Sequence, residues 1–143
     1  MRELDAAEID ELLRNNGIGI LAFDGGVGPY PIPVAFGYES DEQLFVVQLE
    51  GEEDCYKKRC LDHNPNVGFT MYEQAESGTV WRSVVLRGCL EEISYTEAEA
   101  AFATLARNTQ GAPNPVRWGS GGDGMTPYEL QIDHWSGHEF VIE

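Results

Sequence analysis

Three of the nine basic residues in this chain are consecutive: Lys57, Lys58 and Arg59. They follow the apolar segment LFVVQL at residues 44–49, which is typical of a strand. We expect a helix to begin shortly after that strand. The free backbone N–H groups and the positive dipole end of its first turn would lie beside these cations, and both favour an anion such as phosphate.

The same cluster also has a simpler interpretation. Glu53 and Asp54 lie four residues before Lys57 and Lys58, which is the spacing of ion pairs on a solvated helix face. Carboxylates that faced inward would repel a phosphate. Spacing alone leaves both interpretations open.

A second candidate group lies in TVWRSVVLRG, residues 79–88, which alternates as a strand does. Arg82 stands in its middle among apolar residues, so we expect it to be solvated or paired. A guanidinium can hold a phosphate through two parallel hydrogen bonds, and Ser83 can add a hydroxyl. His134 and His138 have a metal-binding spacing only on a helix, and we expect them on a strand.

The charge balance narrows the classes of partner. With 25 acidic and 9 basic residues, the net charge is −16, which opposes binding to nucleic acid or to an anionic membrane surface. The chain contains no apolar run long enough to span a membrane, and its acidic start is unlike a signal peptide, so a cytoplasmic location is expected. The scattered acids favour a halophilic, salt-rich cytoplasm; an acidic mesophilic protein is the alternative. Three cysteines, an odd number, argue against a disulfide framework.

The length is that of a single domain, residues 1–143. Asp5 and Glu8 have the spacing of a capping box at the start of a helix, and Gly17 suits the left-handed position after it. Patterning predicts helices at residues 5–16, 52–63 and 96–106, a loop at 108–123, and strands at 18–23, 30–38, 44–49, 67–72, 80–93 and 128–142.

Strands dominate this pattern, and only a few helices interrupt them. It predicts a mainly β fold with helices, as a closed or nearly closed antiparallel barrel of about six strands. An α+β sandwich is the competing fold. Pro31 and Pro33 each remove a ladder donor, so their part of the strand should lie at an edge or a bulge.

The order of short motifs resembles that of the pyridoxamine 5′-phosphate oxidase-like family of FMN-binding split barrels. The motifs are G-x-L-A, P-Y-x-x-P-V-x-F-x-Y, a helix with basic residues, N-P-x-V-x-F and W-x-S-V-V-x-x-G. The resemblance is good from residue 7 to about residue 93, and YELQIDHWSGHEF looks like the last strand of the family. The chain looks most similar to small haloarchaeal members, which agrees with its acidity.

This resemblance implies a homodimer of six-stranded split barrels with two FMN sites between the subunits. Backbone groups of one strand, at Pro33, Val34, Ala35 and Phe36, would line the ring of FMN, and the next strand would add Val47 and Gln48. The phosphate would be held by the following helix, through Cys55, Lys57 and Lys58. Arg82 and Ser83 would complete the phosphate site, from the same chain or from the partner subunit.

The family also implies a flavin-dependent oxidoreductase acting on a small substrate, in which the flavin carries the chemistry. No catalytic side chain stands out in the sequence. Arg117 and Trp118, in the expected loop, could cover a flavin. Where many relatives have a cation close behind Gly51, this chain has three acids; carboxylates that faced the site would weaken phosphate binding or imply a different cofactor. The alternatives are a deazaflavin or heme on the same fold, and a non-catalytic flavin carrier or sensor.

Overall fold

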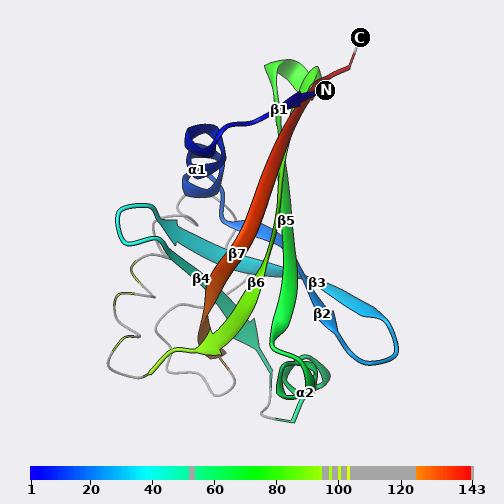
Figure 1. The fold of residues 1–143 in the computed structure, drawn as a ribbon, viewed down its shortest axis with the longest axis vertical. Coiled ribbons are helices and arrows are strands. Elements are labelled where there is room, and N and C mark those ends of the chain that lie inside the picture. Colours follow the sequence, from blue (N-terminus) through cyan, green and yellow to red (C-terminus); the bar gives the residue numbers. More distant parts are fainter. Residues whose placement is uncertain (52–53, 95–96, 98–99, 101–102, 104–124, 143) are drawn as a thin grey trace.

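The computed structural model describes residues 1–51, 54–94, 97, 100, 103 and 125–142. Antiparallel strands and two α-helices make up this part of the chain (Figure 1). The elements are β1 (Arg2–Glu3), α1 (Ala6–Arg14), β2 (Ile18–Asp24), β3 (Pro29–Glu39), β4 (Leu44–Glu50), α2 (Tyr56–His63), β5 (Asn66–Ala75), the 3-10 turn η1 (Glu76–Gly78), β6 (Val80–Glu92) and β7 (Met125–Val141).

The strands form one antiparallel sheet in the order β1-β7-β4-β3-β2-β5-β6, and β6 also pairs with β7. The last pairing closes β2 to β7 into a barrel-like ring, while the two residues of β1 only extend one end of β7. The predicted mainly β antiparallel barrel is therefore confirmed. The first three predicted strands are neighbours in the ring, as short turns between them require.

The ring splits where β3 carries its prolines. Pro31 and Pro33 pair with β2, but β3 begins to pair with β4 only at Ala35, opposite Gln48. On its other edge β4 pairs with β7 from Val46 to Glu50, so Leu49 and Glu50 pair with β7 but not with β3. The missing donors of the prolines thus lie on a stretch of β3 with one strand neighbour, which confirms their predicted edge position.

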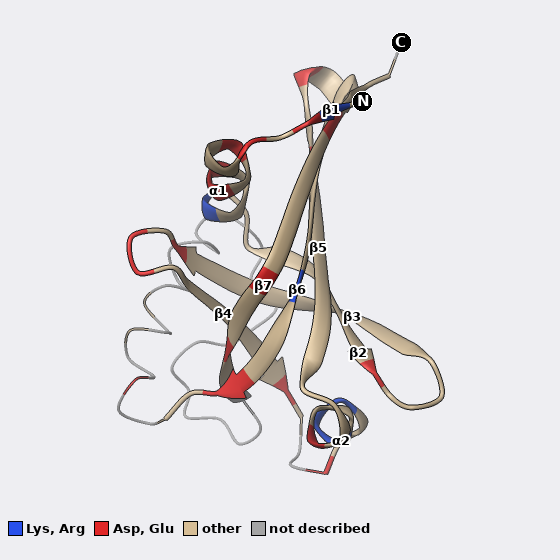
Figure 2. Ribbon diagram, viewed as in Figure 1, with Lys and Arg blue, Asp and Glu red and all other residues tan. Residues whose placement is uncertain are grey.

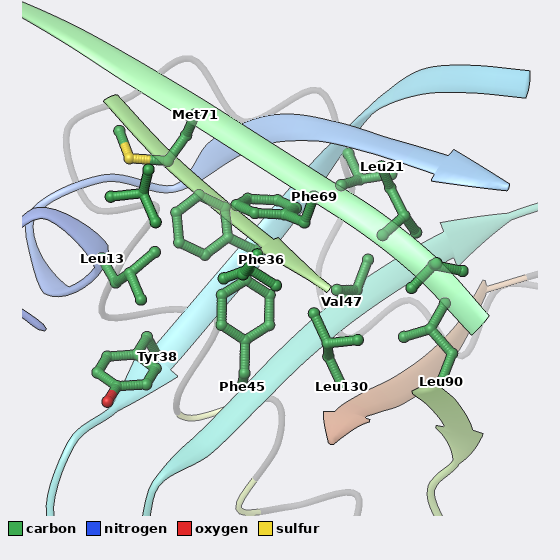
Figure 3. Close-up of a cluster of buried hydrophobic side chains, with 14 of the residues drawn as sticks. Leu13, Leu21, Phe36, Tyr38, Phe45, Val47, Phe69, Met71, Leu90 and Leu130 are labelled. Carbon is green, nitrogen blue, oxygen red and sulfur yellow. The ribbon is translucent and has the colours of Figure 1, made fainter. Parts of the chain in front are cut away.

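The core of the ring is built around three phenylalanines (Figure 3). Phe36 and Phe45 stack with ring centroids 5.2 Å apart, and Phe69 meets each of them edge-on at 5.0 Å. Gly19 of β2 makes room for this cluster, because a Cβ there would overlap the ring of Phe69. Close packing of these rings holds β2, β3, β4 and β5 at fixed distances.

Helix α1 begins as predicted. The Asp5 carboxylate accepts a hydrogen bond from the Glu8 N–H at 2.9 Å, and the Glu8 carboxylate accepts one from the Asp5 N–H at 3.1 Å. The expected left-handed glycine after the helix was wrong: Asn15 is the C-cap, and Gly17 is not among the described glycines with positive φ. Gly17 instead accepts a bond from the Phe36 N–H, which joins the segment to β3.

Helix α2 is shorter than predicted. It begins at Tyr56 with Cys55 as N-cap rather than at residue 52, so Asp54 precedes the helix. Of the expected helix at 96–106, only residues 97, 100 and 103 are described, and the expected loop at 108–123, with Arg117 and Trp118, lies outside the described residues. None of the helices within the described ranges is long and apolar enough to cross a membrane.

Candidate functional site

A cavity of about 230 Å³ lies where β3 and β4 separate. Its walls come from two strands, the start of β2 and one helix. The lining residues are Ile18, Ile32, Pro33, Val34, Ala35, Gln48, Leu49, Glu50 and Lys57. Five of the predicted site residues are therefore brought together here: Pro33, Val34, Ala35, Gln48 and Lys57.

Gln48 is the most informative residue of this cavity. Its side chain is 3% exposed, and neither its Nε2 nor its Oε1 has a hydrogen-bond partner among the described residues. A buried polar group without a partner costs about 1–3 kcal/mol. The carbonyl and amino groups of this amide can accept and donate bonds together. Such an unpaired amide on a cavity wall is the arrangement expected of a ligand contact.

The three consecutive cations on α2 point to three different surroundings. Lys57 lines the cavity. Lys58 is buried, and its Nζ donates to the Gly51 carbonyl at 2.8 Å. Arg59 is exposed, with its guanidinium 5.8 Å from the centre of the Tyr56 ring. Successive helix positions are about 100° apart, so the three side chains leave the helix in different directions.

Gly51, ahead of α2, lies close to Cys55 and Lys57. Gly51 has a φ of +125°, a region that favours glycine, and a Cβ there would lie 2.9 Å from the Cys55 Sγ and 3.3 Å from the Lys57 Cε. Cys55, another predicted site residue, caps the helix without a side-chain hydrogen bond and contacts this turn. Asp54 is exposed ahead of the helix.

Phe36 and Val47 do not line the cavity. They pair with each other across β3 and β4, and both side chains are fully buried in the core (Figure 3). They belong to the predicted strands but face inward, because neighbouring residues on a strand alternate between faces. Their contribution is to hold the β3–β4 pair that carries the cavity wall.

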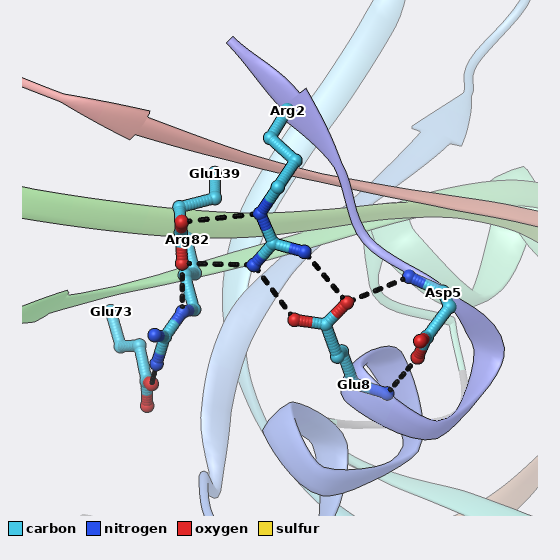
Figure 4. Close-up of polar contacts among 6 residues, drawn as sticks. All are labelled: Arg2, Asp5, Glu8, Glu73, Arg82 and Glu139. Carbon is cyan, nitrogen blue, oxygen red and sulfur yellow. Dashed lines mark hydrogen bonds and ion pairs between the residues drawn. The ribbon is translucent and has the colours of Figure 1, made fainter.

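Arg82 and Ser83 lie elsewhere in the chain's fold. β6 begins beside η1, at the end of the molecule that carries both termini, whereas α2 lies at the opposite end (Figure 1). The Arg82 Nε donates to Glu139 at 2.7 Å, and its Nη1 lies 3.9 Å from Glu73 (Figure 4). Ser83 is half-buried on the opposite face of the strand. Within one chain, these two residues do not meet Lys57.

Glu139 links Arg82 to the start of the chain. Its carboxylate also accepts from Arg2, which in turn makes two bonds to Glu8, at 2.9 and 2.8 Å (Figure 4). The bonds from Arg82 and then Arg2 lower the pKa of Glu139, and the Arg2 bond lowers the pKa of Glu8 to about 2. This network fastens β1 and α1 to β6 and β7.

Sequence reasoning missed four residues of the cavity: Ile18, Ile32, Leu49 and Glu50. The sequence contains a hint for Ile18. It is a large apolar residue on the exposed face of β2, whose alternate residues Gly19, Leu21 and Phe23 are buried, and an exposed apolar residue of this kind can indicate a contact surface. Glu50 adds a carboxylate to the same wall as Lys57. Among the described residues acidic ones outnumber basic ones, and three of the basic residues lie together on α2 (Figure 2).

An antiparallel ring that splits between two strands and opens a cavity there defines a split barrel. A family model described as pyridoxamine 5′-phosphate oxidase matches residues 5–139, and the chain belongs to this family. A comparison with curated proteins found no match.

Solved structures share the fold at low identity. An FAD-binding protein from Mesorhizobium loti has a TM-score of 0.75 and 23% identity, covering 98% of each chain. The FAD-binding protein from Mycobacterium smegmatis has a TM-score of 0.65 and 17% identity, covering 99% of this chain and 100% of that one. An FAD and heme binding protein from the same organism has a TM-score of 0.72 and 18% identity, covering 100% and 74%.

Proposed function

We propose that this chain binds a flavin, FMN, in the β3–β4 cavity and acts as a homodimeric flavin-dependent oxidoreductase on a small substrate. The observation that carries the proposal is the buried amide of Gln48, whose two polar atoms have no partner among the described residues. The structural neighbours described as FAD-binding support a flavin as the class of ligand.

The residues present fit this ligand. A flavin ring is planar and has adjacent hydrogen-bond donors and acceptors along one edge, which an amide can match from the cavity wall. Pro33, Val34 and Ala35 supply a short apolar wall on the other strand. The Lys57 ammonium is one cation, which suits the single phosphate of FMN. The Glu50 carboxylate on the same wall weakens the attraction of Lys57 for the phosphate, but it does not change the contacts of the ring with Gln48.

When bound, the flavin would supply the electron or hydride chemistry. The chain's own residues would bind and orient the ring and exclude water from one side of it. We assign no catalytic side chain among the described residues. Turnover therefore has to be tested separately from binding.

An exposed apolar face supports the homodimer. Ile20, Thr70, Val85 and Ser136 are paired in one row across β2, β5, β6 and β7, and alternation places Ile18 and Tyr72 on the same side of the sheet. The outer apolar face consists of Ile18, Ile20, Tyr72, Trp81, Val85 and Phe140, of which all but the half-buried Trp81 are exposed. Apolar surface of this kind is typical of protein contacts.

Ile18 belongs to both the outer apolar face and the cavity. A second copy covering that face would therefore also close one side of the cavity. Arg82 and Ser83 could reach a flavin only in such a dimer, from the partner chain. Substituting Val85 by Glu should give a monomer with weakened flavin binding, as measured by light scattering and by titration.

Direct binding tests the proposal. Purified protein is titrated with FMN and with FAD, and binding is followed by quenching of flavin fluorescence. Lys57→Ala should weaken FMN binding about tenfold or more, because a charge-assisted hydrogen bond contributes about 1.5–3 kcal/mol. Arg59→Ala removes the same charge from the same helix outside the cavity, and it should leave the affinity nearly unchanged.

Three results would contradict the proposal: no flavin binding, equal affinity in the Lys57→Ala and Arg59→Ala proteins, or a preference for FAD over FMN, which would replace the cofactor named here. Bleaching of the bound flavin by NADH or NADPH would distinguish an oxidoreductase from a carrier. Heme is disfavoured because the cavity residues described contain none of the usual axial ligands, His, Met, Cys or Tyr.

A further inference from the structure

A second and larger cavity, of about 800 Å³, lies on the other side of β2 from the flavin cavity. It opens between the outer end of the β2–β3 hairpin and the sheet of β5, β6 and β7. Its polar lining residues are Asp24, Asn66, Arg87, Asp133 and His134. We call it the hairpin cavity. It shares no lining residue with the flavin cavity.

The floor of the hairpin cavity is one row of the sheet. Ala22 pairs with Gly68, Gly68 with Arg87, and Arg87 with His134, so the four residues lie side by side. Ala22 and Gly68 have little or no side chain, so this part of the cavity is open, and the longer side chains of Arg87 and His134 lie next to it. Asp133 is the extra residue at the irregularity where β6 and β7 change register.

Packing does not explain the glycine in this row. Gly68 is not among the described residues with positive φ, and a Cβ there would meet only the Leu86 carbonyl, at 4.0 Å. A Cβ at this position would therefore meet no close contact, and a side chain built on it would extend over the floor. Glycine here keeps the cavity open, whereas Gly19 is required by the ring of Phe69.

Arg87 lines this cavity and forms no ion pair with a carboxylate of the described residues. Its side chain is exposed. Arg2, Arg14 and Arg82 are each paired. In a chain with 25 acidic and 9 basic residues, an arginine that faces a cavity without a partner remains available to a ligand.

We propose that the hairpin cavity binds the anionic group, carboxylate or phosphate, of a small molecule with an apolar body. Arg87 would take the anion through its guanidinium fork, with His134 beside it. Ala22 and Pro29 provide apolar wall for the body of the molecule. The inference does not depend on the flavin cavity. The floor of the hairpin cavity is the neighbouring row to Ile20, Thr70, Val85 and Ser136 on the same side of the sheet, so a second copy on the outer apolar face would border this cavity.

The two carboxylates of the cavity limit what it can bind. Asp24 accepts bonds from the Gly26 N–H at 3.0 Å and from the Asn64 Nδ2 at 3.1 Å, so the hairpin and α2's end hold it. Asp133 stands beside His134 and opposes an anion by like-charge repulsion. A ligand with a single anionic group is therefore favoured over one with several.

The test uses phenyl phosphate and benzoate as probes, with benzyl alcohol as their uncharged counterpart, and follows backbone amide resonances by NMR. We expect saturable shifts at Gly68, Arg87 and His134 with both anions, and none with the alcohol. Arg87→Gln should weaken binding about tenfold or more, since a charged hydrogen bond is lost. Arg59→Gln, which makes the same change outside the cavity, should not.

Two further variants separate shape from charge. Gly68→Leu fills the floor without changing any charge and should also abolish the shifts, while Asp133→Asn should strengthen binding by removing the repulsion. Equal weakening by Arg87→Gln and Arg59→Gln, shifts centred on Lys57 instead, or unchanged binding in Gly68→Leu would each overturn the proposal. Flavin titration of the same variants is a separate measurement, so failure of one proposal is distinguishable from failure of the other.

Discussion

Replacing Gln48 by Leu should stabilise the flavin-free protein and weaken its flavin binding. The Gln48 amide is buried at 3% exposure without a hydrogen-bond partner among the described residues, so its desolvation is uncompensated. Leucine has nearly the same size and carries no polar atom. The substitution removes that cost from the folded state, and it also removes the group we propose to contact the flavin.

The magnitude follows from the cost of one unpaired buried polar group. Relief of that cost should raise the free energy of unfolding by about 1–3 kcal/mol. With a urea dependence of about 1–3 kcal/mol per M, a gain of about 2 kcal/mol moves the midpoint by roughly 1 M. Flavin-free proteins should be compared at one protein concentration, because dimerisation would add to stability.

Gln74→Leu is the matched control. Gln74 is an exposed strand residue of β5, so the same chemical change there should alter the free energy of unfolding by no more than about 0.5 kcal/mol. The reasoning is refuted if Gln48→Leu lowers the urea midpoint of the flavin-free protein. It is also refuted if the variant binds FMN as tightly as the parent.

Two other predictions concern stability. The Arg2 guanidinium holds the pKa of Glu8 at about 2, below its ordinary 4.5, so the ionised Glu8 stabilises the fold above about pH 4.5, and this contribution is lost as the pH falls toward 2. Arg2→Gln should therefore lower the melting temperature at pH 6 and have progressively less effect as the pH falls; an equal effect at both ends of the range would contradict this. Gly19→Ala should lower the free energy of unfolding by about 1–3 kcal/mol, because its Cβ would overlap Phe69. Gly68→Ala is the control, because Gly68 has no positive φ and a Cβ there meets no close contact. It should lower the free energy of unfolding much less than Gly19→Ala.

Local signals in the sequence predicted local structure well. The spacing of Asp5 and Glu8 predicted the capping box, because all its bonds lie within four residues. Pro31 and Pro33 predicted the edge of β3, since a missing N–H constrains the strand wherever it lies. The start of α2 was misplaced because acids at residues 52–54 suit a first helical turn as well as the preceding loop.

Non-local features could not be predicted in this way. Arg82 meets Glu139, 57 residues further along the chain, and only the closure of the ring by β6 and β7 brings the two together. The sequence shows that Gln48 is the polar residue of LFVVQL. Its lack of a hydrogen-bond partner among the described residues depends on where the pairing of β3 with β4 ends. The hairpin cavity likewise depends on the register of four strands.

The three consecutive cations illustrate why residue type and spacing had to be combined with structure. As a sequence, Lys57, Lys58 and Arg59 indicate a single anion site. On a helix that begins at Tyr56, the three side chains point in different directions, and the Lys58 Nζ donates a hydrogen bond to the Gly51 carbonyl. Only Lys57 remains for a phosphate, and Glu50 shares its cavity. We therefore infer that, in one chain, Lys57 alone of the three holds the flavin phosphate, while Gln48 contacts the ring from the neighbouring strand.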